Sequence, residues 1–408
     1  MIQTPTRRGV LAGAAVLAAS PAIAALPETT GSAPIGRAEY EARIAKAQRL
    51  MRQAGFSALL IESGSSLTYF TGVRWGRSER LTGAVIPAAG RIGIVTPHFE
   101  EPSVRESLAV EAEVRVWQED QDALTVVAGL LRDRKVASGP IGIEETVRYF
   151  AVDGLAKALP LAVIRSGAGV VRGCRMIKSP AEIALMQRAS DITIAAYRDT
   201  YGKIAKGMTR DDIAKLMDAA TRARGGEPEF SLVLLGEASA YPHGSHQRQV
   251  LADGMTVLMD CGCTVQGYQS DISRTFVFGE ALREQRMVWD QVRRGQTMAF
   301  AAARVGTPAG QIDDTVRRYY ESLGYGPGYA LPGLPHRTGH GIGLDGHEPV
   351  NLVHGETTPL APGMCFSDEP GLYLPGKFGV RLEDCFHMTE QGARWFSTPP
   401  TSIDRPFG

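Results

Sequence analysis

Apolar and polar residues alternate along the chain with two different periods, and each period predicts a different kind of element. We predict a helix where apolar residues recur every three or four positions, or where a capping residue and a glycine bracket the segment. Short apolar or alternating runs bounded by glycine, proline or polar turns predict strands. The predicted helices span 38–54, 121–134, 180–203, 209–225 and 281–304. The predicted strands span 58–61, 83–87, 91–96, 113–117, 140–143, 230–236, 255–261 and 267–278.

The order of these elements divides the chain into two domains. Strands and helices alternate at first, which predicts a small α/β domain over residues 37–172. A sharp helix start follows, because Ser179 can cap the helix, Pro180 suits its first position and Glu182 its first turn. The second domain then spans 173–408, and a chain of 408 residues is long enough for two domains.

A strand that ends in a carboxylate occurs twice in the second domain. Residues 252–260, ADGMTVLMD, recur 109 positions later as residues 361–369, APGMCFSDE. A Gly-x-x-x-acid pattern recurs 112 positions later and pairs Asp271 with Glu383. The helical part repeats as well, because Gly207, Ile213 and Gly225 recur 99 positions later as Gly306, Ile312 and Gly324. The pair His243-Gly244 recurs 97 positions later as His340-Gly341. These repeats predict an α+β domain built from two related halves, with a site where the halves meet.

Carboxylates in such apolar strands point to a bound metal. A buried carboxylate has to be paired or bind a cation, because an isolated charge is costly to bury. For Asp260 alone, a turn-capping role is an equally good explanation. The repeat favours a metal site, because it supplies two acids from each half. These acids are Asp260, Asp271, Glu369 and Glu383.

Histidines can supply nitrogen ligands to the same site. Six of the eight histidines lie between positions 243 and 354, most densely in residues 335–349, PHRTGHGIGLDGHEP. The glycines around them leave little core for imidazole rings to fill and permit close approach to a ligand. The run lacks the His-Glu-x-x-His spacing of helical zinc proteases. Oxygen-rich ligands with an imidazole suit two divalent ions roughly 3.5–4 Å apart that share a water or hydroxide nucleophile.

Composition narrows the list of partners. The 44 Lys and Arg residues balance 44 Asp and Glu residues, so the net charge does not point to nucleic acid or an anionic membrane. The cysteines are odd in number and form no small disulfide framework, so we expect them to pack in the core. They are Cys174, Cys261, Cys263, Cys365 and Cys385, the last expected on the strand face of Glu383.

The N-terminus has the pattern of an export signal. Arg7 and Arg8 form a twin-arginine motif, an apolar run follows, and residues 22–24 make a small-x-small cleavage site. Beyond it no apolar run approaches the roughly 18 residues of a membrane span. We therefore expect a cleaved twin-arginine-type signal over 1–24 and a flexible leader over 25–36. The protein would be periplasmic or secreted, with no stable membrane anchor.

The ligand candidates and their neighbours resemble the metal site of the pita-bread metallopeptidases. That family includes Xaa-Pro dipeptidase, aminopeptidase P, methionine aminopeptidase and creatinase. The motifs that carry the resemblance are Asp260-x-Gly262, Ser270-Asp271-Ile272-x-Arg274-Thr275, Gly339-His340-Gly341-Ile342-Gly343, Glu369-Pro370-Gly371 and Arg381-Leu382-Glu383-Asp384. In the first domain, Tyr69-x-Thr71-Gly72 is similar to the N-terminal domain of the prolidase, aminopeptidase P and creatinase branch. The resemblance covers roughly residues 37–395.

This resemblance implies a fold and a set of metal ligands. The fold would be a pita-bread catalytic domain with an internal pseudo-two-fold repeat, after a smaller α/β domain of the creatinase and prolidase type. Asp260 would bind one ion, and His340 and Glu369 the other. Asp271 and Glu383 would bridge the two. The ions would be divalent, with Mn²⁺ favoured and Co²⁺, Zn²⁺ or Fe²⁺ as alternatives.

The resemblance also implies catalytic roles. Glu369 would act as general base on the bridging water. His243 and His347 would contact the substrate backbone and stabilise the tetrahedral intermediate. Arg381 would support catalysis and hold the substrate's carboxylate through a bidentate fork.

Three further residues are implied to bind substrate. His336 would line the site, and Tyr373 would help to hold the C-terminal side of the substrate. Trp75 or its neighbours would reach the site of a partner subunit in a homodimer. One position departs from the family pattern, because Asp368 precedes Glu369 where an apolar residue is usual. On a strand its side chain should point away from the metals, either behind the ligands or toward solvent.

The predicted function is hydrolysis of X-Pro bonds in short proline-containing peptides by a dinuclear metal-bridged water, as a dipeptidase or an aminopeptidase. Creatinase-like hydrolases of non-peptide C–N bonds and lyases of small osmolytes use the same scaffold, so they are an alternative. A metal-free binding module is a second alternative, although each of the five ligand positions in this sequence still has a residue that can bind a metal.

Overall fold

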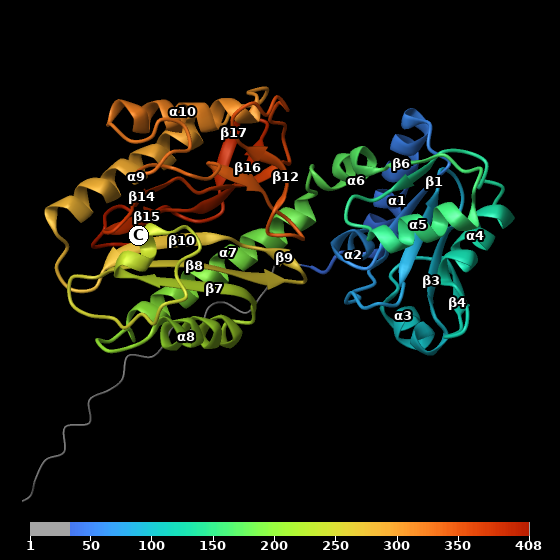
Figure 1. Ribbon diagram of the computed structural model, residues 1–408, viewed down its shortest axis with the longest axis horizontal. Coiled ribbons are helices and arrows are strands. Elements are labelled where there is room, and N and C mark those ends of the chain that lie inside the picture. Colours follow the sequence, from blue (N-terminus) through green and yellow to red (C-terminus); the bar gives the residue numbers. More distant parts are fainter. Residues whose placement is uncertain (1–32, 408) are drawn as a thin grey trace, which may run out of the picture.

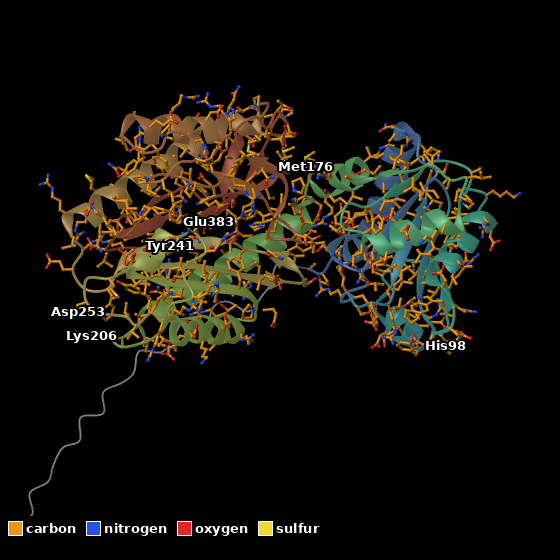
Figure 2. The ribbon with its side chains drawn as sticks, viewed as in Figure 1. His98, Met176, Lys206, Tyr241, Asp253 and Glu383 are labelled. Carbon is orange, nitrogen blue, oxygen red and sulfur yellow. The ribbon has the colours of Figure 1, made fainter. Side chains whose placement is uncertain are left out.

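The computed structural model describes residues 33–407 and contains two domains side by side (Figure 1). The predicted export signal, residues 1–24, lies outside the described residues. Within the described part, no helix is long and apolar enough to cross a membrane. The smaller α/β domain and the larger α+β domain follow the predicted fold class. The chain passes from one to the other near Met176 (Figure 2).

The N-terminal domain is a six-stranded sheet with helices and apolar cores on both faces (Figure 1). Its strand order is β4-β3-β2-β1-β5-β6, with β1 antiparallel to β2 and parallel to β5. The strands are β1 (Ala58–Glu62), β2 (Gly83–Pro87), β3 (Ile92–Pro97), β4 (Ala112–Trp117), β5 (Ile141–Ile143) and β6 (Ile164–Ser166). The helices are α1 (Arg37–Ala54), α2 (Ser65–Thr71), α3 (Glu101–Ser107), α4 (Ala123–Asp133), α5 (Tyr149–Ala158) and α6 (Ala168–Arg175).

The C-terminal domain consists of two halves, each with a pair of helices and a set of strands. The first half contains α7 (Pro180–Tyr201), α8 (Arg210–Ala223), β7 (Glu227–Leu235), β8 (Thr256–Val265), β9 (Tyr268–Gln269) and β10 (Ile272–Val277). The second contains α9 (Arg283–Ala302), α10 (Ala309–Ser322), β11 (Gly339–Gly341), β12 (Glu348–Leu352), β13 (Cys365–Asp368), β14 (Gly371–Leu374), β15 (Phe378–Arg381), β16 (Asp384–Thr389) and β17 (Gly392–Trp395). The sheet orders are β10-β8-β7 and β12-β11-β13-β16-β17, and β14 pairs with β15. The helix pairs lie outside the strands (Figure 1).

Local sequence signals set the ends of several helices. Helix α1 ends where Gly55 adopts a left-handed conformation with φ 73°, which a glycine reaches without steric cost. Helix α7 begins at a capping box in which the side chains of Ser179 and Glu182 each bond the other's backbone N–H. The predicted domain boundary after residue 172 falls inside α6, which packs on the core of the N-terminal domain.

The predicted strand over 267–278 is interrupted at Asp271, and the break positions a ligand candidate. Ser270 still donates its backbone N–H to Cys263 O at 3.0 Å, while its Oγ accepts the backbone N–H of Cys263 at 3.1 Å and lies 2.8 Å from Thr193 Oγ1. The chain re-enters the sheet one residue after Asp271. The strand pattern missed this break because no glycine or proline marks it, and the Oγ of Ser270 takes a backbone N–H that would otherwise continue the ladder.

Buried charges join the two domains. Arg175, at the end of α6, and Lys178 contact Glu348 at the start of β12, at 2.5 and 2.9 Å. Arg175 also pairs with Asp345 at 2.8 Å, and Ser65 of α2 donates to the same carboxylate. These contacts fix the segment from Asp345 to Glu348 against the N-terminal domain.

The substitution Glu348→Gln is expected to weaken this junction in a pH-dependent way. Burial opposes ionisation of Glu348, yet Lys178 and Arg175 outweigh it and lower its pKa to about 2. The unfolded pKa is about 4.3, so the stability due to this charge is present above that pH. That stability is lost as the pH falls through about 2.

The measurement is the urea midpoint as a function of pH. At pH 7 the variant should unfold at a lower urea concentration than the wild type, and the gap should close between about pH 4.3 and about 2. A gap of constant size over this range would contradict the assignment.

Candidate metal centre

The five predicted ligands come from different strands or strand ends and meet between the sheets of the C-terminal domain. Asp260 lies within β8, Asp271 precedes β10, His340 lies within β11, Glu369 follows β13, and Glu383 lies between β15 and β16. Glu383 is inside the domain, among the strand layers (Figure 2). Its backbone N–H donates to Ser273 O at 3.1 Å, which ties the strands of the two halves together at this point.

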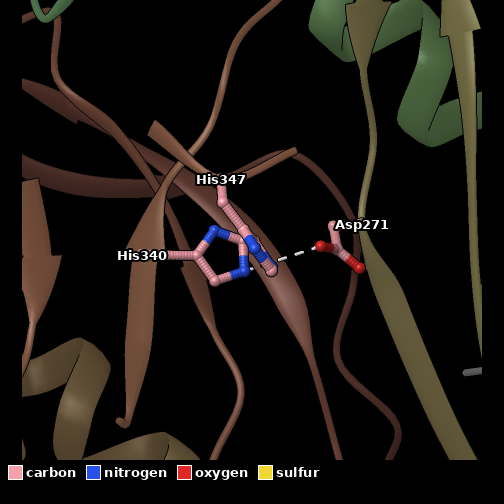
Figure 3. A group of neighbouring side chains, drawn as sticks. All are labelled: Asp271, His340 and His347. Atoms are coloured by element: carbon pink, nitrogen blue, oxygen red, sulfur yellow. Dashed lines mark ion pairs between the residues drawn. The ribbon is translucent and has the colours of Figure 1, made fainter. Parts of the chain in front are cut away.

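The side-chain donor atoms are close enough to share ions. His340 Nε2 lies 3.6 Å from Asp271 Oδ2 (Figure 3) and 3.3 Å from Glu369 Oε1. Among the described residues, three groups bring their ligand atoms within 4.8 Å of one another. They are Asp260 with Asp271 and Glu383, His340 with Glu369 and Glu383, and Asp271 with His340 and His347. Glu383 joins the first group to the second, and Asp271 joins the first to the third.

The hydrogen bonds of the acids leave oxygens for a cation. Arg381 Nη2 donates to Asp260 Oδ2 at 2.7 Å, and Ser273 Oγ donates to Glu383 Oε2 at 2.8 Å. The second oxygen of each acid is buried without a hydrogen-bond partner, and so is Asp271 Oδ1. Because buried polar atoms are nearly always satisfied, these three oxygens fit divalent cations that prefer oxygen ligands.

Burial and mutual repulsion oppose ionisation of Asp271 and Glu383. They raise the pKa of Asp271 and of Glu383 well above the ordinary carboxyl range. Burial also raises the pKa of Glu369 to about 7, with Arg381 acting against it and Asp260 adding to it. Cations among the carboxylates would offset both effects, so the electrostatics of the donor set fit metal ions as well.

His340 is held as a neutral imidazole with Nε2 near the acids. Its Nδ1 lies 3.0 Å from Gly341 O, so Nδ1 carries the proton and Nε2 is left to accept. Burial, and after it His347, lowers the pKa of His340 well below the ordinary imidazole value. The backbone N–H of His340 donates to Ser367 Oγ at 3.1 Å, which fixes β11 against β13.

Arg381 is committed to protein groups. Its Nε donates to Ser273 Oγ at 2.9 Å, and its Nη1 to Tyr373 OH at 2.8 Å and Pro242 O at 3.1 Å. With the bond to Asp260, four of its five N–H groups are in use. In this structure Arg381 positions Asp260, and its predicted hold on a substrate carboxylate stays a prediction.

A cavity of about 340 Å³ adjoins the ligands. It is lined by Pro242, His243, Asp260, Asp271, His336, Arg337, His340, His347, Glu369, Arg381 and Glu383. The three histidines predicted to contact substrate, His243, His336 and His347, are thus in its wall. The rings of His340 and His347 lie 4.2 Å apart, edge to face (Figure 3).

Tyr373 supports the cavity wall and is buried behind it. Its OH lies 2.9 Å from His336 Nε2 and accepts from Arg381. Burial raises the pKa of Tyr373 to about 12 against the opposing effect of Arg381. Burial, and then Arg381, lowers the pKa of His336 to about 3. Both side chains are therefore neutral, and Tyr373 donates to His336.

Trp75 and Asp368 lie away from the cavity. Trp75 is half-buried against the core of the N-terminal domain, so its contact with a partner subunit stays a prediction. Asp368 is fully buried, with neither carboxylate oxygen hydrogen-bonded. Of the two expected positions, behind the ligands or toward solvent, the structure gives the buried one, because α9 covers this side of β13, where Gln296 Nε2 donates to Asp368 O at 3.4 Å. Burial, and then Asp384, raises the pKa of Asp368 well above its usual value.

All five cysteines are buried and free, as predicted. Cys385 lies beside the ligands, with its Sγ 3.2 Å from Asp271 O. Burial raises the pKa of Cys385 well above the ordinary thiol value, so it remains a neutral packing residue.

Sequence reasoning missed three residues that shape the site. Ser273 binds Glu383, and Asp313 of α10 accepts the backbone N–H and Oγ1 of Thr338 at 3.1 and 2.7 Å. Neither has a local signal that separates it from an ordinary strand or helix residue. Arg337, in the cavity wall, could have been found as the one cation among the histidines and glycines of residues 335–349.

Comparison with known proteins gives matches over both domains. Residues 43–177 match the creatinase/prolidase N-terminal domain, and residues 184–390 match metallopeptidase family M24. The probable dipeptidase PepE of Mycobacterium bovis is 34% identical over 358 residues, covering 87% of this chain and 93% of that protein. The Xaa-Pro dipeptidase of Lactobacillus helveticus is 28% identical, and the match covers 86% of this chain and 95% of that protein. The crystal structure of dipeptidase PepE from Mycobacterium ulcerans has a TM-score of 0.83 at 32% identity, covering 91% of this chain and 98% of that one.

Proposed function

Because the chain belongs to metallopeptidase family M24, we propose that it hydrolyses X-Pro bonds in short peptides as a dinuclear dipeptidase or aminopeptidase. The observation that carries this proposal is the joined set of five metal-ligand candidates, with unpaired buried oxygens, beside a cavity walled by histidines. A similar protein from Lactobacillus helveticus is called a Xaa-Pro dipeptidase, which supports proline after the scissile bond.

In this proposal the chain's own donors would divide between two ions. Asp260 would hold one ion, and His340 and Glu369 the other, with Asp271 and Glu383 shared. When bound, such ions would polarise the peptide carbonyl and lower the pKa of a water molecule. We propose Mn²⁺ as the metal, with Co²⁺, Zn²⁺ or Fe²⁺ as alternatives, because oxygen donors with one imidazole suit these ions.

Residues of the cavity would orient the substrate and move the proton. Glu369 would take a proton from the attacking water at its carboxylate and pass it to the leaving nitrogen. His243 and His347 are in the wall, where an imidazole N–H can donate to the oxygen of the scissile peptide. The Tyr373 and Arg381 pair behind them keeps Asp260 and His336 in place.

A peptide panel with metal-loaded protein tests the proposal. We expect turnover of X-Pro dipeptides or X-Pro-Y peptides after loading with Mn²⁺ or Co²⁺, loss of turnover with a chelator, and about two ions per chain by mass spectrometry. Turnover of a small C–N substrate such as creatine, with no peptide cleaved, would instead favour the creatinase-like alternative. Protein that binds no divalent metal would favour the binding module.

A further inference from the structure

Two arginines line the cavity, and only one of them is committed to other groups of the protein. Arg381 uses four N–H groups on protein acceptors, as described above. Arg337 donates from Nη1 to Asn351 Oδ1 at 3.1 Å, and no carboxylate of the described chain lies within salt-bridge distance of it. A half-buried guanidinium in a cavity wall without an anionic partner is an unpaired positive charge with free donors.

The sheet places this charge beside the metal ligands. Asn351 on β12 lies opposite His340 on β11, and directly opposed side chains share a face of a sheet. Asn351 therefore holds the Arg337 guanidinium on the face where His340 meets the acids.

The backbone of Arg337 is fixed on both sides. Arg317 of α10 donates to His336 O, and Thr338 N donates to Asp313 Oδ1 at 3.1 Å. Arg317 and Asp313 also pair with each other at 2.7 Å, within one buried turn of the helix. A ligand-binding guanidinium needs such a rigid base, because binding then costs little conformational entropy.

We propose that Arg337 binds the free carboxylate of the substrate's C-terminal residue and thereby makes the chain a dipeptidase. This inference rests on the proposed X-Pro hydrolysis. In an X-Pro dipeptide the carboxylate belongs to the residue just after the scissile bond. The group that binds this carboxylate therefore has to lie in space no further from the metal ligands than the length of one residue. Arg337 meets that requirement, and its planar fork suits a carboxylate. A cavity of about 340 Å³ is at the small end of ligand pockets and suits a dipeptide.

The test compares each X-Pro dipeptide with its C-terminal amide, which lacks the charge. The wild type should prefer the acid, and Arg337→Gln should raise KM for the acid about 10- to 100-fold with kcat little changed, because a charge-assisted contact made equally in ground and transition states is lost. KM for the amide should not change. Arg337→Lys should recover part of the preference through its charge, and Asn351→Ala should lose part of it.

Binding gives a second readout that does not depend on turnover. Calorimetry with the product should show the wild type binding L-proline more tightly than L-prolinamide, and Arg337→Gln should abolish that difference. Arg304→Gln is the matched control, because Arg304 is exposed, outside the cavity wall and in no salt bridge of the described chain. It should behave as wild type in both assays.

Two failures can be told apart. If the wild type cleaves X-Pro dipeptides and Arg337→Gln keeps the full preference for the acid, Arg337 is only a wall residue and the inference is wrong, while the proposed function stands. If the wild type cleaves no peptide at all, the proposed function is wrong. In that case an equal affinity of the wild type for proline and prolinamide would overturn the carboxylate site independently.

Discussion

Asp271→Asn is expected to remove metal retention and peptidase activity together. Asp271 belongs to two of the three ligand groups, and one of its oxygens is buried with no hydrogen bond. An amide has a similar shape but no charge, so it cannot serve as a shared anionic ligand. Loss of an outer-sphere partner of a metal site already costs about 10–100-fold, and loss of a shared ligand should cost more. Metal content by mass spectrometry and turnover of an X-Pro dipeptide should fall in parallel.

The same substitution should have the opposite effect on the stability of the metal-free protein. Burial and the charges of Asp260 and Glu369 oppose ionisation of Asp271. A neutral amide avoids the free-energy cost of burying or protonating this acid beside the others, so metal-free Asp271→Asn should melt at a higher temperature than metal-free wild type. Adding Mn²⁺ should then raise the Tm of the wild type by mass action and leave the variant nearly unchanged.

Asp253→Asn is the matched control for these measurements. Asp253 is exposed at the surface, where it pairs with Lys206 (Figure 2). Its loss should change neither metal content nor turnover, because exposed ion pairs contribute little. An Asp271→Asn protein that keeps both ions and wild-type turnover would remove Asp271 from the ligand set.

The sequence repeat identified the acids because a metal site between two related halves needs equivalent residues in each. Asp260 and Glu369 stand at the same place in the two copies. The strand pattern placed Glu369 correctly at a strand end, but it ended the strand of Asp260 at residue 261, whereas β8 continues to Val265. The four acids and the α+β class therefore follow from local patterns and internal symmetry, whereas the family resemblance supplied His340 as a ligand and the pita-bread fold.

The role of Arg381 could not be predicted in the same way. Its committed state depends on acceptors at Pro242, Ser273 and Tyr373, which are far apart in the chain. Whether an arginine in a cavity is free for a ligand is decided by how many of its donors the fold has already used. That number is a property of the assembled domain, and a motif around Arg381 does not contain it.

The burial of Asp368 has a similar cause. The strand period predicts that its side chain points away from Glu369, and Asp368 is absent from the cavity wall that Glu369 lines. What lies on that side depends on α9, whose Gln296 reaches the strand. A strand period gives the face of a residue, but only the packing of layers decides whether that face meets solvent or another element.

The largest effect on stability is expected from Arg274, which forms a fully buried ion pair behind the metal ligands. Arg274 Nη2 donates to Asp384 Oδ1 at 2.7 Å, and both side chains are 0% exposed. Arg274 Nη1 also donates to Glu383 O at 2.8 Å. The pair therefore holds the backbone of a ligand candidate as well as the strands β10 and β16.

Arg274→Met should destabilise the protein by about 3–5 kcal/mol, because it leaves the charge of Asp384 buried without its partner. For a domain of this size that corresponds to a Tm lower by roughly 6–20 °C. Thermal unfolding of the metal-free protein measures the effect without a contribution from bound ions.

The double variant Arg274→Met with Asp384→Leu separates the ion pair from the packing around it. Apolar residues of similar volume can replace a buried pair at little cost, so the double variant should recover most of the lost Tm. Recovery should be incomplete, because Gln296 Nε2 donates to Asp384 Oδ2 at 3.0 Å and would lose that acceptor. The restored protein should still bind metal less tightly than the wild type, because the Glu383 carbonyl has lost its donor. If the double variant were as unstable as Arg274→Met, the cost would lie in the lost backbone contacts of Arg274 and not in an unpaired Asp384.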